Sequence, residues 1–101
     1  MAFAKHQGVS KEAVWLGENV RYLRRHVIGL SIVKFCEKYK LGYSFIARLE
    51  TGKTDVSIDY AAHLAAVLGE PLADLLRPPA TLRATRPAKF VSYEQNASAA
   101  S

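Results

Sequence analysis

The sequence predicts an all-α domain, and three observations carry that prediction. Apolar residues recur three or four positions apart in successive segments, which is the period of one face of a helix. Serines stand where several of these segments begin and glycines where they end, and these residue types cap helices at those ends. The chain has 101 residues, half of them hydrophobic, which is enough for one small core. We therefore expect a compact five-helix domain with a C-terminal extension.

The first expected helix follows a flexible N-terminal arm, residues 1–10. Ser10 is placed to cap this helix and Gly29 to end it. Four apolar residues share one face: Leu16, Val20, Leu23 and Val27. The outer face carries Glu18, Arg21, Arg24 and Arg25, which form either a solvated charged surface or a basic surface for an anionic partner.

The next two helices are short and are joined by a tight turn. Ser31 caps the first, whose apolar face consists of Ile32, Phe35, Cys36 and Tyr39. In the second, Ile46 and Leu49 face the core, and the run Lys40-Leu41-Gly42 between the helices lacks a period. Another side of this third helix is available for a partner and carries Tyr43, Ser44, Ala47 and Arg48. These two helices are a helix-turn-helix candidate.

Two more helices complete the expected domain, residues 11–77. Gly52 ends the third helix, and Ser57 is placed to cap a fourth, which Gly69 stops. Its expected buried stripe is Ile58, Ala61, Leu64, Ala65 and Leu68. Pro71 starts a fifth helix built on Leu72, Leu75 and Leu76. We expect Pro78-Pro79 to terminate the compact part.

The extension, residues 78–101, changes in composition. It is first rich in Pro, Thr and Arg, and then contains a β-leaning stretch at residues 88–94. Two interpretations of that stretch stay open: a short strand that pairs with its copy in a dimer, or a segment that lies over the core. The last residues are expected to be disordered.

Composition narrows the class of protein. The net charge of +5 favours a polyanionic partner. The single cysteine, Cys36, lies on an apolar helix face, so we expect a buried thiol and a cytoplasmic protein. No signal region and no apolar run of about 18 residues occurs, so we expect neither secretion nor a membrane span. The three histidines are scattered and no catalytic or metal-ligand spacing is present, so we expect no enzyme and no cofactor.

Motif residues of matching type and spacing run through residues 16–76. They are Leu16-Gly17-Glu18-Asn19-Val20, Leu23-Arg24-Arg25, Gly29-Leu30-Ser31, Ile46, Arg48-Leu49-Glu50, Gly52-Lys53-Thr54, Leu64-Ala65, Leu68-Gly69 and Leu75-Leu76. In these residues the chain resembles the Cro/C1-type helix-turn-helix DNA-binding domain, the phage-repressor-like XRE family. The resemblance implies a lambda-repressor-like fold whose third helix enters the DNA major groove.

The resemblance also implies roles for individual residues. Base contacts are expected from Tyr43, Ser44, Ala47 and Arg48. DNA-backbone contacts are expected at the start of the second helix and in the loop after the third, at Ser31, Ile32, Gly52, Lys53 and Thr54. The family pairs an arginine near the end of the first helix with the glutamate of the third, and here we expect Arg25 and Glu50 to form that structural ion pair.

Three positions depart from the family pattern. Ile32 replaces a glutamine that bonds a phosphate, Phe45 replaces a small polar residue, and Lys40 replaces a glycine at a position where a positive φ is expected. The first hypothesis is a sequence-specific regulator of transcription, a repressor, that binds a palindromic operator in double-stranded DNA as a homodimer. The alternative is an antitoxin-like or co-regulator protein that binds a partner chain through the tail or through an apolar patch of Ile32, Tyr43 and Phe45.

Overall fold

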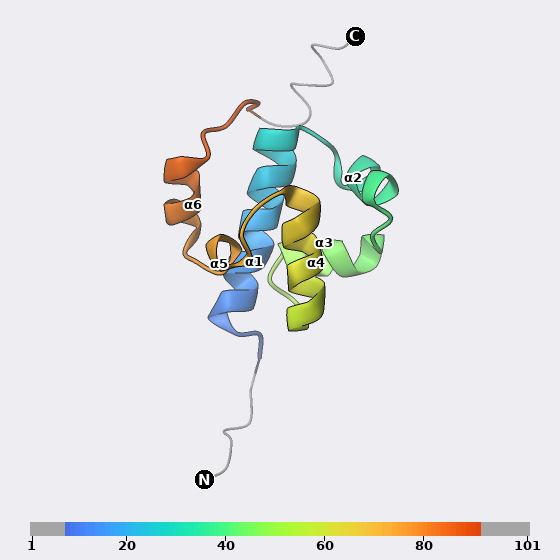
Figure 1. Cartoon of the computed structure of the whole chain (residues 1–101). Helices are drawn as coiled ribbons and strands as arrows, with labels where there is room; N and C mark the ends of the chain where they lie inside the picture. The colour runs from blue at the N-terminus through green and yellow to red at the C-terminus, as the bar shows by residue number, and fades with distance from the viewer. Residues whose placement is uncertain (1–7, 92–101) are drawn as a thin grey trace.

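The computed structural model describes residues 8–91, which form six α-helices and one π-helical segment (Figure 1). The elements are α1 (Lys11–Tyr22), η1 (Leu23–Ile28), α2 (Ile32–Tyr39), α3 (Tyr43–Glu50), α4 (Ile58–Leu68), α5 (Leu72–Leu75) and α6 (Pro79–Thr85). The all-α prediction is confirmed. No strand occurs in residues 8–91, so the strand interpretation fails for residues 88–91, whereas residues 92–94 lie outside the described part, as do residues 1–7 of the arm and the end of the chain.

The predicted helix starts are confirmed by side-chain caps. The hydroxyls of Ser10, Ser31 and Ser57 accept hydrogen bonds from the backbone N–H groups three residues onward, at 3.1, 3.2 and 3.0 Å. Each bond satisfies a donor that the first turn of a helix otherwise leaves without a partner. At the other end, η1 continues α1 as far as Gly29, whose φ of 79° lies in the left-handed region that glycine adopts without strain.

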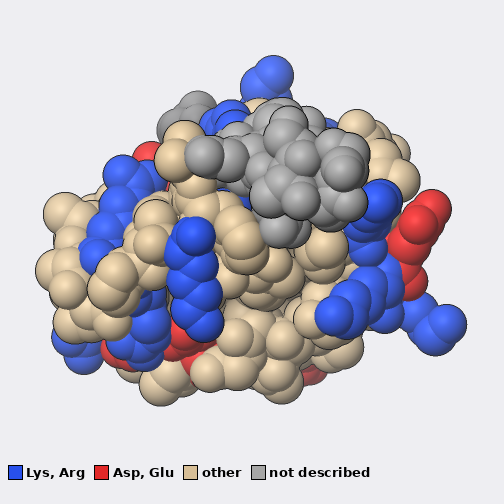
Figure 2. All heavy atoms as spheres, turned by 90° about the horizontal axis from the view of Figure 1, so that it is seen from above, with Lys and Arg blue, Asp and Glu red and all other residues tan. Residues whose placement is uncertain are grey.

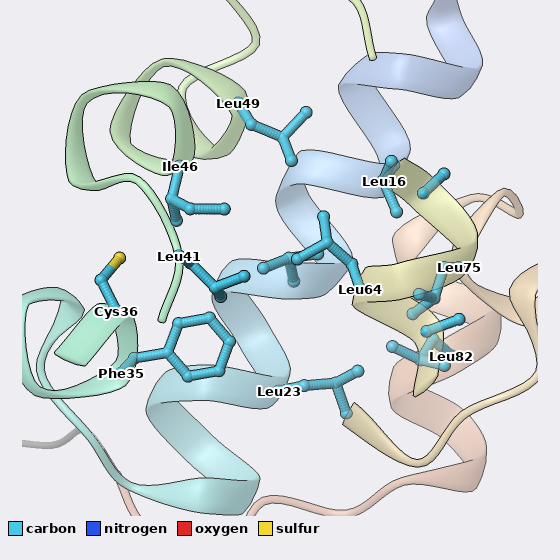
Figure 3. Close-up of a cluster of buried hydrophobic side chains, with 13 residues drawn as sticks. Leu16, Leu23, Phe35, Cys36, Leu41, Ile46, Leu49, Leu64, Leu75 and Leu82 are labelled. Carbon is cyan, nitrogen blue, oxygen red and sulfur yellow. The ribbon is translucent and has the colours of Figure 1, made fainter. Parts of the chain in front are cut away.

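The core gathers around α1, which stands in the middle with α5 and α6 on one side and α2 and α3 on the other (Figure 1). Side chains from all six α-helices point toward one another in this core (Figure 3). The fully buried large apolar residues are Leu16, Val20, Leu23, Phe35, Ile46, Leu49, Leu64 and Leu75. The period-based expectation for the inner faces of α1, α2 and α3 is therefore confirmed.

Two expectations about the second half of the chain are wrong. Ile58 was placed in the buried stripe of α4, yet its side chain is 69% exposed. It is the first residue of α4, and because Cβ atoms tilt toward a helix's N-terminus, its side chain projects beyond the packed part of the helix. Pro78-Pro79 does not end the compact part: Pro79 begins α6, and Leu82 of that helix is 2% exposed. Proline is tolerated at a first helical position because its missing N–H has no partner there.

The residues after α6 dock on the end of the first helix. The Tyr22 hydroxyl donates to the Arg86 carbonyl at 2.6 Å, and the Arg86 guanidinium pairs with Glu70 and Asp74 at 2.6 and 3.3 Å. The backbone N–H groups of Lys89 and Phe90 both donate to the His26 carbonyl. Up to Phe90 the extension is thus attached to the domain, whereas Val91 is 70% exposed.

Candidate nucleic-acid interface

The turn between α2 and α3 fixes their mutual orientation. Lys40 caps α2 with φ 58° and ψ 50°, a left-handed conformation, as its position predicted. The next residue, Leu41, is buried, and its N–H donates to the Cys36 carbonyl at 2.9 Å. A left-handed lysine costs some conformational energy, and the buried Leu41 offsets that cost. The two helices therefore form the helix-turn-helix that the sequence predicted.

Helix α3 has an apolar inner face and an exposed polar outer face. Ile46 and Leu49 are fully buried. Tyr43, Ser44 and Arg48 are exposed, and Ala47 is half-buried among them. The four expected base-contacting residues thus share one accessible side of a single helix. A partner bound to this side can contact the phenol of Tyr43, the hydroxyl of Ser44, the methyl group of Ala47 and the guanidinium of Arg48 at the same time.

The rear of α3 rests directly on the backbone of α1. A Cβ atom built on Gly17 would lie 1.8 Å from the Leu49 carbonyl oxygen, far inside any real contact distance. Only glycine permits this approach. The outer face of α3 is therefore held by backbone packing, with no flexible side chain in between.

A buried ion pair is the second contact that attaches α3 to the first helix. The sequence predicted Arg25 as the partner of Glu50, but the partner is its neighbour Arg24. Arg24 donates from Nε and Nη2 to the two Glu50 carboxylate oxygens, at 2.8 and 2.9 Å, and both side chains are about 5% exposed. Arg24 lies seven residues after Gly17, two helical turns, on the side that faces α3. Arg25, the next residue of η1, projects from a different side of the helix and lines a hollow that faces α6.

Arg24 also positions both segments that were expected to contact a DNA backbone. Its Nη1 donates to the Leu30 carbonyl at 2.8 Å, directly before the Ser31 cap of α2. Its partner Glu50 stands two residues before Gly52, where the loop after α3 begins. One guanidinium therefore fixes the start of α2 and the end of α3 relative to each other.

The five expected backbone-contacting residues differ in what they expose. Lys53 is exposed, and its backbone N–H is bonded to the Arg48 carbonyl at 2.9 Å. Lys53 can therefore contact a phosphate only through its side chain. Gly52 has φ 74°, and Thr54 donates its hydroxyl to the Asp55 carbonyl. The Ser31 hydroxyl oxygen accepts the cap bond and keeps its O–H as a donor, and Ile32 is half-buried against the core. Ser31 can therefore offer an anion its hydroxyl, whereas Ile32 can offer only its backbone N–H at the start of α2.

No protein-family model, curated protein or solved structure matches this chain. Charge is the remaining guide to the interface. Between residues 32 and 54 the exposed cations are Lys34, Lys38, Lys40, Arg48 and Lys53, and the exposed acid is Glu37. Seen from above, Lys and Arg are prominent on the side of α2 and on the side of α6, and others lie at the upper edge of this view (Figure 2).

The expected apolar patch is only partly present. Phe45 packs edge-on against Tyr60 of α4, with ring centroids 5.0 Å apart, and Ile32 packs on the core, so of the three expected residues Tyr43 alone is largely exposed. The sequence did not indicate Val33, which is 49% exposed and lines a mainly apolar hollow. The other residues of its lining are Cys36, Glu37, Leu41 and Tyr43. Burial raises the pKa of the Cys36 thiol, which favours its neutral form.

The described residues, 8–91, contain no group of three His, Cys, Asp or Glu side chains placed to hold a metal ion. Nor does any helix among them have the length and apolar character needed to cross a membrane.

Proposed function

We propose that this protein is a transcription regulator of the Cro/C1 helix-turn-helix type, which binds a palindromic operator in double-stranded DNA as a cytoplasmic homodimer. One observation carries the proposal. The exposed face of α3 presents Tyr43, Ser44 and Arg48 together, on a helix fixed from behind by Gly17 and by the Arg24–Glu50 pair. A rigid helix with several hydrogen-bonding groups on one accessible face suits a DNA major groove, which admits an α-helix.

Arg48 is the proposed principal base-reading residue. Its exposed planar guanidinium can donate two hydrogen bonds to O6 and N7 of one guanine, a contact worth about 1–3 kcal/mol of discrimination. Tyr43 and Ser44 supply hydroxyl groups for neighbouring bases, and the Ala47 methyl suits a thymine methyl group. A repressor acts by occupying its operator, and a two-fold dimer places two such helices about one turn of DNA apart.

Phosphate contacts are proposed for the two segments that Arg24 joins. The N-terminus of α2 offers backbone N–H groups and the positive end of the helix dipole. Lys53 adds a charge from the loop after α3. Neither contact reads sequence, but together they orient α3 in the groove.

The test is selection of bound sequences from a random DNA library, carried out with the natural chain and with Arg48→Ala. We expect the natural chain to enrich an inverted repeat and Arg48→Ala to lose its preference at one base pair of each half. Lys38→Ala is the matched control, because it removes an exposed cation from α2 and should leave the enriched sequence unchanged. If the natural chain enriches no sequence at physiological salt, the proposal fails.

A second candidate function is supported by the apolar hollow beside Tyr43. Val33 and Tyr43 are each about half exposed at its rim, an arrangement that suits a protein partner in an antitoxin-like or co-regulator role. Val33→Ser discriminates the two functions: it removes the apolar side chain without adding a charge beside the proposed phosphate contact of α2, and it should weaken only the binding of a partner chain.

A further inference from the structure

A hollow of about 300 Å³ lies between the first helix and α6, away from the helix-turn-helix. It is lined by Glu18, Arg21, Tyr22, Arg25, His26 and Arg83. Five of these residues come from α1 and η1, and Arg83 comes from α6, far along the chain. The function proposed above gives this hollow no role.

The lining carries an excess of positive charge. Three guanidinium groups face one carboxylate, that of Glu18. Within residues 8–91, neither Arg21 nor Arg83 takes part in an ion pair. Arg86, the next arginine along, differs from them because Glu70 and Asp74 neutralise it. Arg21 and Arg83 alone outnumber the single carboxylate of Glu18, so the hollow lacks about one negative charge, which a bound anion would supply.

The walls of the hollow are fixed before any ligand arrives. The Arg83 guanidinium lies over the Tyr22 ring, 5.3 Å from its centroid, and the Tyr22 hydroxyl is bonded to the Arg86 carbonyl. His26 stacks beside Tyr22 with ring centroids 5.3 Å apart. Its Nδ1 lies 2.8 Å from the Phe90 carbonyl, which can only accept, so Nδ1 carries the proton and Nε2 is left for another partner. Because these side chains are held in place before binding, less conformational entropy is lost when a ligand binds.

We propose that this hollow is a binding site for a small phosphorylated molecule, with the phosphoryl group between Arg21 and Arg83. The guanidinium fork matches two phosphate oxygens at once, and a phosphate ester supplies the missing negative charge. The volume is at the lower end of small-molecule sites, roughly 300–1,000 Å³, which limits the ligand to a small one. The bound anion bridges α6 to α1.

The direct test is calorimetric titration of the full chain with inorganic phosphate and with phenyl phosphate, at constant ionic strength set by chloride. Both probes should bind, and Arg21→Gln and Arg83→Gln should each weaken binding about tenfold, the loss of one charge-assisted contact. Arg77→Gln is the matched control, since Arg77 is exposed and lies outside this hollow, and its binding should be unchanged. Arg83→Lys keeps the charge without the fork and should retain part of the affinity.

Equal affinity in Arg21→Gln, Arg83→Gln and the natural chain would overturn the site, as would binding no tighter than that of chloride. Unfolding measured on the same samples separates a lost ligand contact from a lost fold. The expected result is that all four variants have the same unfolding midpoint as the natural chain in the absence of phosphate.

A phosphoryl group could also come from a DNA backbone. The salt dependence of DNA binding separates the two sources, because each lost phosphate contact lowers the slope of log K against log salt by about one. We expect the slope to be the same for the natural chain and Arg83→Gln. A lower slope for the variant would assign the hollow to DNA and overturn the small-molecule site. If the chain binds no DNA, the phosphate titration still decides the matter, so the two proposals fail separately.

Discussion

Arg24 is the residue on which the geometry of the helix-turn-helix depends most. It is buried, and its donors reach both oxygens of Glu50 and the carbonyl of Leu30. A buried charge is tolerated only when such partners surround it, and removal of one member leaves the other uncompensated. The arginine therefore couples the end of the first helix to both ends of the candidate interface.

We predict that Arg24→Ala lowers the free energy of unfolding by about 3–5 kcal/mol, because it leaves the Glu50 carboxylate buried without its partner. Urea unfolding followed by circular dichroism measures the loss. Arg25→Ala is the matched control, since Glu50 is paired with Arg24 and not with Arg25. The loss of unfolding free energy in Arg25→Ala should be clearly smaller. A double change of Arg24→Met and Glu50→Leu should recover part of the stability, because no charge is then left buried. Equal losses for the two alanine variants would contradict the assigned pair.

Lys53 gives a second prediction at the residue scale, and it rests on the proposed function. The side chain is exposed in the loop after α3, so its loss should leave stability within about 0.5 kcal/mol of the natural chain. DNA affinity should fall by a similar factor for all sequences, and the salt slope should drop by about one unit. Fluorescence anisotropy over a salt series measures both quantities. A change in sequence preference, or an unchanged slope, would mean that Lys53 does not contact a phosphate.

Helices α1 and α3 pack against each other at Gly17. Gly17 lets the carbonyl at Leu49 approach so closely that no side chain fits between the two helices. We predict that Gly17→Ala pushes α3 away from α1 and costs about 3 kcal/mol, the upper end of what overpacking usually costs. Thermal unfolding by calorimetry measures the cost.

Gly42→Ala is the matched control for that change. Gly42 has φ −74° and open space around the added methyl group, so alanine there should cost no more than about 1 kcal/mol. A Gly17→Ala variant as stable as Gly42→Ala would show that α1 and α3 are not packed backbone to backbone.

Much of the element scale was predictable, because local chemistry decides it. Ser10, Ser31 and Ser57 are caps whose bonds span three residues, and the inner faces of α1 to α3 follow the helical period. The choice between Arg24 and Arg25 was not predictable in the same way. Successive residues of a helix project from different sides, so the partner of Glu50 depends on how α1 and η1 are turned against α3, which Gly17 helps to set.

At the scale of the whole molecule, the sequence placed the boundary of the domain too early. A pair of prolines usually stops a helix, and α6 offers only one buried apolar residue, Leu82, too few to produce a visible period. The contacts that hold α6 are long-range: Tyr22 to the Arg86 carbonyl, and the His26 carbonyl to Lys89 and Phe90. Such contacts depend on the assembled fold, so no local pattern indicates them.

Two truncated chains test whether α6 and the residues after it are an integral part of the domain or a dispensable tail. A chain that ends at Arg77 loses Leu82 from the core and the bond from Tyr22, and we expect it to lose at least about 3 kcal/mol, as large core truncations do. A chain that ends at Val91 keeps all the contacts described above and should unfold at a clearly higher urea concentration than the chain that ends at Arg77. Because α6 packs on the helix that carries Gly17 and Arg24, the shorter chain should also bind DNA more weakly if the proposed function holds. Equal stability of the two truncated chains would mean that α6 is an appendage and that the core closes without it.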